Sequence, residues 1–206
     1  MKLALKKLLQ AHPSIQVSTL LSGSLTTPSA KAAFIPPTAF ESIATANPSS
    51  ASVTFSAIPQ TYTHLQIRGV VRSASYMGAA DYYSIRINSD SGNNYNASGL
   101  KVNNTTVASF DRNGGQPEIF AGEFTGAAEP ANQFGGIVLD IFDYTNTNKV
   151  KTVKYFYESI RYGQGEAGIS SGIWNSTSAI TSITITGYFG GGFAANSQLA
   201  LYGIKG

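Results

Sequence analysis

Short stretches of alternating apolar and polar residues run through the chain from Val53 to its end. Residues 65–71 and 84–87 alternate in this way, and residues 137–142 are apolar on both faces except for Asp140. A period of two is typical of a half-buried β-strand, and a continuous apolar run is typical of a central one. The same reasoning predicts strands over 150–158, 169–174, 180–186 and 198–204, with 143–149 as the turn of a hairpin.

A helical pattern occurs only near the N-terminus, over residues 2–12, where Pro13 ends it. A helix this short is not stable alone, so we expect it to be frayed or docked on a partner. The alternative is a disordered terminus. The apolar face holds Ala4, Leu5, Leu8, Leu9 and His12, and the basic face holds Lys2, Lys6 and Lys7.

Residues 13–40 have the composition of an extended linker, because Pro28, Pro36 and Pro37 disfavour a helix. Apolar residues such as Phe34 and Ile35 are too many for a purely solvated linker. We therefore expect this segment to lie along a neighbouring subunit. The chain divides into an N-terminal anchoring arm, residues 1–40, and a folded domain, residues 41–206.

The folded domain is predicted to be all-β. Many short strands separated by Gly- and Asn-rich turns indicate two packed sheets, in a jelly-roll-type β-sandwich. The predicted fold is thus a sandwich with an extended N-terminal arm that contains a short amphipathic helix.

Charge separates the same two regions. The chain of 206 residues has a net charge of +3, but no acidic residue precedes Glu41. Four of the 14 Lys and Arg lie in the arm, which leaves 10 against 11 acidic residues in the domain. A nucleic-acid binder concentrates basic residues on its folded surface, so we expect no nucleic-acid partner. A basic arm is suited to an acidic protein surface. No apolar run reaches the ~20 residues of a membrane span, so no membrane partner is expected.

The sequence offers little catalytic chemistry. Cysteine is absent, and His12 and His64 lack clustered partners, so we expect no metal site, no cofactor and no enzymatic activity. Gly163–Gly168 matches a dinucleotide-binding pattern, but a strand rather than a helix is expected after it, so we interpret it as a Gly-rich loop. Asp111–Gly115 is interpreted as a turn rather than a calcium loop.

Aromatic residues are the remaining candidates for binding. They are expected in the core or in a subunit interface, and the alternative is a surface on which a glycan stacks. The residues named for the interface or glycan role are Tyr82, Tyr83, Tyr155, Tyr157 and Trp174.

Five segments form a series along the chain: Phe40–Thr45, Val53–Gly69, Asp140–Val153, Gly172–Ile185 and, at the C-terminus, Ser197–Gly206. In this order, and with a similar C-terminus, they resemble small virion proteins of tailed bacteriophages. The likeness covers roughly residues 40–206 and excludes the arm. It implies a jelly-roll structural protein of the phage particle that forms a homotrimer, and it brings no catalytic residues.

Together these observations predict a capsid decoration or cement protein located in the virion and assembled in the cytoplasm of the host bacterium. Its arm would clamp the major capsid protein or another virion subunit. The docking residues would be Lys2, Leu5, Lys6, Lys7, Leu8, Leu9, Phe34 and Ile35. The alternative is a tail-fibre or adhesin module that binds a glycan of the host surface.

Overall fold

The computed structural model describes residues 39–161 and 164–206, which contain twelve β-strands and no helix. All ten strand pairings are antiparallel. The strands are β1 (Phe40–Ala46), β2 (Ser52–Phe55), β3 (His64–Val71), β4 (Ala80–Ile87), β5 (Tyr95–Asn103), β6 (Thr106–Gln116), β7 (Ile119–Thr125), β8 (Gly135–Phe142), β9 (Lys151–Arg161), β10 (Gln164–Trp174), β11 (Ile183–Gly187) and β12 (Gln198–Ile204).

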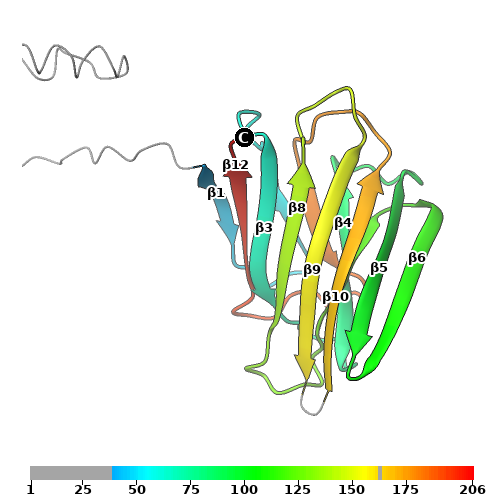
Figure 1. The fold of residues 1–206 in the computed structure, drawn as a ribbon. Coiled ribbons are helices and arrows are strands. Elements are labelled where there is room, and N and C mark those ends of the chain that lie inside the picture. The colour runs from blue at the N-terminus through cyan, green and yellow to red at the C-terminus, as the bar shows by residue number, and fades with distance from the viewer. Residues whose placement is uncertain (1–38, 162–163) are drawn as a thin grey trace, which may run out of the picture. The chain divides into compact units, whose positions relative to one another are not determined.

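The strands form two sheets of unequal width. The larger has eight strands in the order β1-β12-β3-β8-β9-β10-β5-β6, and the smaller has four in the order β2-β11-β4-β7. Figure 1 shows the larger sheet face-on, with β1 at one edge and β6 at the other. The all-β prediction is confirmed, and the two sheets are consistent with a β-sandwich.

Alternation along each strand builds the core. In β3, Leu65 and Ile67 are fully buried, whereas the next residue, Arg68, is exposed on the opposite face of the strand. In β11, Ile183 and Ile185 are buried and pair with Ile87 and Ile85 of β4. The inner faces of both sheets thus supply one continuous apolar cluster.

The predicted strands around 65–71, 84–87, 137–142, 150–158 and 198–204 are confirmed, including the β8–β9 hairpin. Strands β1, β5, β6 and β7 were not predicted. Strand β5 contains Asn, Ser and Gly among few large apolar residues, so its alternation is weak.

Two predicted loops are wrong. Residues Gln164–Gly168 belong to β10, and Asp111–Gly115 lie inside β6. Next to a register shift between β5 and β6, Gly114 and Gly115 have φ values of 91° and 79°. Positive φ at glycine bends the strand as a bulge, so these residues do not reverse the chain as a turn would.

Candidate functional site

The docking residues predicted in the arm, Lys2 to Leu9 together with Phe34 and Ile35, lie outside the described residues. So does the predicted amphipathic helix over 2–12. Candidate binding sites are therefore found on the surface of the described domain alone.

Four of the five aromatic residues proposed for a glycan or subunit interface lie in the core. The exposed fractions of Tyr83, Tyr155, Tyr157 and Trp174 are 0%, 2%, 1% and 3%. Such buried side chains cannot stack on a sugar or a neighbouring subunit, so that prediction is wrong for these four. The expectation of a place in the core is correct for them.

Tyr157 shows why one of these rings is buried. Its ring lies against Gly168 on the adjacent strand and Gly122 on the opposite sheet. A Cβ at Gly168 would come within 2.3 Å of the ring, and one at Gly122 within 2.4 Å. The glycine of the Gly163–Gly168 pattern therefore makes room for a tyrosine, not for a phosphate.

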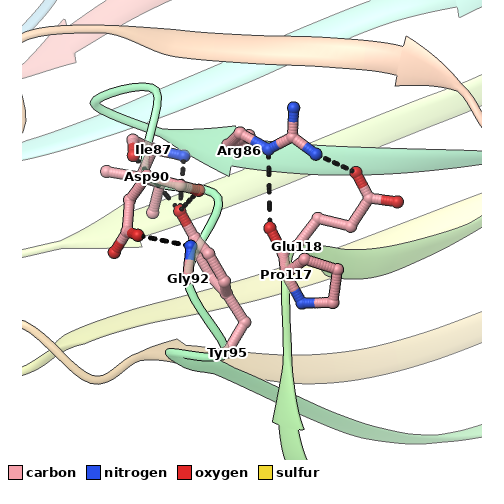
Figure 2. Close-up of polar contacts among 7 residues, drawn as sticks. All are labelled: Arg86, Ile87, Asp90, Gly92, Tyr95, Pro117 and Glu118. Carbon is pink, nitrogen blue, oxygen red and sulfur yellow. Dashed lines mark hydrogen bonds and ion pairs between the residues drawn. The ribbon is translucent and has the colours of Figure 1, made fainter.

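Trp174 helps to fix the loop between β4 and β5. Its indole N–H donates to the Asp90 carboxylate at 2.7 Å, which lowers the pKa of that carboxyl. Figure 2 shows the rest of this network, in which Asp90 also accepts a hydrogen bond from the Gly92 amide. The Tyr95 hydroxyl donates to the Asp90 carbonyl at 3.0 Å. These contacts give Trp174 a structural role.

The same region links β4 and β7, the strands before and after the β5–β6 hairpin. Arg86 of β4 forms an ion pair of 3.1 Å with Glu118, and its Nε donates to the Pro117 carbonyl (Figure 2). Since Pro117 and Glu118 connect β6 to β7, this contact sets where β7 enters the smaller sheet.

An apolar band crosses the outer face of the larger sheet. Val138 pairs with Phe156, Phe156 with Ile169, and Ile169 with Leu100, so these side chains stand in one row over four strands. Phe156, Leu100 and Ile169 are 49%, 55% and 61% exposed. Shallow hollows flank the row. The apolar band consists of Val138, Phe156, Ile169 and Leu100, with Val102 and Val107 beside them.

A charged cluster lies directly behind the band, because Lys101 points inward between the outward-facing Leu100 and Val102. Lys101 Nζ is 2.9 Å from Glu123 Oε1 and 3.2 Å from Glu166 Oε2. Burial, reinforced by the neighbouring Glu123 carboxyl and opposed by Lys101, raises the pKa of Glu166 to about 7. Both glutamates are buried, so this carboxyl pair does not face solvent where a substrate would bind.

Tyr82, the fifth predicted aromatic, belongs to a separate cluster of aromatic side chains. Its ring lies 4.9 Å from Phe120 and 5.4 Å from Phe189. Phe189 also stacks on Tyr76 and meets Tyr188 edge-on. We call these five residues the aromatic platform. Sequence reasoning missed Phe120, Tyr188 and Phe189, although the Tyr-Phe-Gly-Gly-Gly stretch that begins at Tyr188 could have indicated an aromatic turn.

Histidine and acidic residues form no metal centre here. The His64 imidazole accepts a hydrogen bond from the Asp143 amide at 3.0 Å. In residues 39–161 and 164–206, no three His, Asp or Glu side chains are grouped to hold a metal ion. Nor does any helix in this part of the chain have the length and apolarity needed to cross a membrane.

Comparison with known proteins adds no further constraint. No protein-family model, curated protein or solved structure matches the chain. The apolar band and the aromatic platform are the two candidate binding surfaces of the described domain.

Proposed function

We propose that this protein is a structural component of a tailed-phage virion, of the capsid decoration or cement type, and not an enzyme. The apolar band is the observation that carries the proposal. Large aliphatic side chains grouped on one exposed sheet face are typical of a surface that is covered in the assembled state.

The strand order supports a jelly-roll topology. If the β5–β6 and β9–β10 hairpins are set aside, the first remaining strand pairs with the last, β1 with β12, and the second with the second last, β2 with β11. The series continues with β3–β8 and β4–β7. This nested pairing is what a long antiparallel ribbon forms when it rolls into two sheets. The two hairpins widen one sheet of the roll.

The size of the outer face fits a subunit interface. Eight strands at about 4.8 Å spacing and seven residues at about 3.4 Å give a face of roughly 900 Å². A stable protein–protein interface buries about 800 Å² on each partner. We therefore assign the face to contacts between copies of the chain, in a homotrimer.

The arm then attaches the trimer to the capsid. Its lysines match acidic residues of the coat, and Leu5, Leu8 and Leu9 supply an apolar anchor. Three arms on one trimer bind together, so weak individual docking becomes tight through effective concentration. This accounts for a basic arm on a domain that is almost neutral.

The test separates the two surfaces with two full-length variants. Ile169→Asp, in the band, is expected to weaken trimer formation at least a hundredfold, measured by analytical ultracentrifugation. Leu8→Asp/Leu9→Asp, in the arm, should leave the trimer intact and abolish binding to undecorated capsids of the phage, measured by co-sedimentation. Val150→Asp is the matched control, because Val150 is also exposed but lies outside the band.

A trimer that survives Ile169→Asp, or capsid occupancy that survives the arm variant, would overturn the corresponding half of the proposal. The alternative location is a tail-fibre or adhesin. Copy number in purified virions decides between the two, since hundreds of copies indicate decoration and a handful indicate a tail.

A further inference from the structure

The aromatic platform is partly open to solvent. Tyr188 and Phe189 are 44% and 49% exposed, and Tyr82 is half-buried beneath them. The rings lie 4.8–6.1 Å from their neighbours, so they form one connected surface rather than scattered side chains.

A buried carboxylate holds the platform in place. Asp81 is fully buried and accepts hydrogen bonds from the amides of Tyr82 at 2.7 Å and Phe189 at 3.3 Å. Ser73 also donates to it, at 2.9 Å. Gly191, next in the turn, has no room for a Cβ, which would lie 2.6 Å from the same carboxylate. The exposed rings are therefore pre-ordered before any ligand arrives.

A cation lies over the same rings. The Arg112 guanidinium is 4.2 Å from the centroid of Phe120 and 6.0 Å from that of Tyr188. Among the residues that the structure describes, this guanidinium forms no ion pair and no hydrogen bond. Its fork of N–H donors therefore remains available to an anion.

From this geometry we infer that the aromatic platform and Arg112 bind an acidic carbohydrate. The exposed rings stack on the C–H face of a sugar, and Arg112 pairs with its carboxylate. The Tyr76 and Tyr188 hydroxyls form no hydrogen bond within residues 39–161 and 164–206, so both are available to sugar hydroxyls. The inference is independent of the proposed decoration function.

The contrast with the apolar band favours a sugar over a protein partner. Five of the six residues of the band are aliphatic and Phe156 is its one aromatic residue, whereas all five residues of the platform are aromatic and a guanidinium lies over them. Aromatic rings with polar edges suit ligands that carry an apolar face and many hydroxyls. The ring face packs against the apolar face of the ligand, and the hydroxyl at the ring edge forms hydrogen bonds.

The experiment measures binding of oligogalacturonate, an acidic probe, and of a neutral dextran oligosaccharide to the full-length protein by isothermal titration calorimetry. We expect the acidic probe to bind more tightly. Phe189→Ala should weaken its binding about tenfold, in line with the loss of one stacked ring. Arg112→Gln should weaken it at least about tenfold while leaving the neutral probe within twofold.

Arg68→Gln is the matched control, because Arg68 also lies over an aromatic ring, Phe40, but on the outer face of the larger sheet. It should bind the acidic probe as the unchanged protein does. Arg112→Lys, which keeps the charge, should retain part of the preference, and thermal melts confirm that each variant is folded. Equal binding of the two probes, no binding of either, or unchanged acidic binding by folded Arg112→Gln would overturn the inference.

Discussion

The outer faces of the two sheets differ in chemistry although the strands of both sheets belong to one chain. On the smaller sheet, Thr184 pairs with Thr54 on one side and Arg86 on the other, and the two threonine hydroxyls lie 2.9 Å apart. On the larger sheet the corresponding row holds Phe156, Ile169 and Leu100. β-Branched polar residues satisfy strand propensity and water together, so an exposed aliphatic row is not needed for folding. Under the proposed function, a second copy of the chain covers this row.

The largest effect should come from making the two outer faces alike. The triple substitution Leu100→Thr/Phe156→Thr/Ile169→Thr keeps strand-forming residues but removes the exposed apolar surface. We expect self-association to weaken at least about a thousandfold, measured by sedimentation, because the centre of the interface is lost. The free energy of unfolding of the monomer should change by about 1 kcal/mol or less. An unchanged oligomer would show that the band is not the interface.

The next largest effect tests how the aromatic platform is supported. Asp81→Ala removes a buried acceptor and leaves the Tyr82 and Phe189 amides without their partner. The free energy of unfolding in urea should fall by about 3 kcal/mol. Self-association through the band should remain unchanged in the folded fraction. A variant as stable as the unchanged protein would show that the turn at 187–192 is held by other contacts.

The charged cluster behind the band predicts a dependence on pH. The folded protein binds the Glu166 proton more tightly than the unfolded chain, because burial raises this pKa from 4.5 to about 7. The free energy of unfolding should therefore decrease as pH rises from about 4.5 to about 7, by on the order of 2 kcal/mol, and the contribution of Glu166 should level off above that.

The measurement compares urea unfolding across this range with that of Glu166→Gln, which keeps the shape and cannot ionise. The variant should lose most of the slope. The carboxyls of Asp90 and Asp143 have lowered pKa values, so their titration falls below this window and does not mask it. Equal slopes for the two proteins would show that the cluster does not bind the proton cooperatively with folding.

The smallest effect should come from the hydroxyl row of the smaller sheet. Thr184→Val removes one exposed hydrogen bond and adds one methyl group to a polar face. The free energy of unfolding should stay within about 0.5 kcal/mol, and self-association should not increase. New association by this variant would mean that a single aliphatic residue is enough to create an interface. The difference between the two outer faces would then not explain which of them self-associates.

The sequence predicted the strands whose apolar residues are large and regularly spaced. Strands β3, β8 and β12 belong to this group, since each buries at least two Leu, Ile or Val residues spaced two apart. Strand β5 escaped prediction because Gly99, Ser98 and Asn96 provide little contrast between its two faces. Its place is determined by pairing with β10, a contact between distant parts of the chain, and β6 then pairs with β5 at the edge of the sheet.

The candidate site was harder to predict than the fold. Tyrosine occurs both in protein cores and on surfaces, so the sequence pattern does not place it. Tyr157 is buried because Gly168 and Gly122 leave room for its ring. Tyr188 and Phe189 come directly after β11, in a turn where no alternation of apolar and polar residues indicates their position. Arg112 became a candidate only when the structure placed it over Phe120, a contact between β6 and β7.

The pairing of β1 with β12 has a consequence for the order of folding. Phe40 lies opposite Ile204, so the first described strand has no neighbour in its sheet until the last one has been synthesised. Contacts between such distant residues slow folding, since a long loop must close before they form. β12 also lies between β1 and β3 in the sheet. A chain that ends before Gln198 therefore lacks the pairing partner of β1 and one of the two neighbours of β3. The larger sheet therefore closes only after β12 has been synthesised.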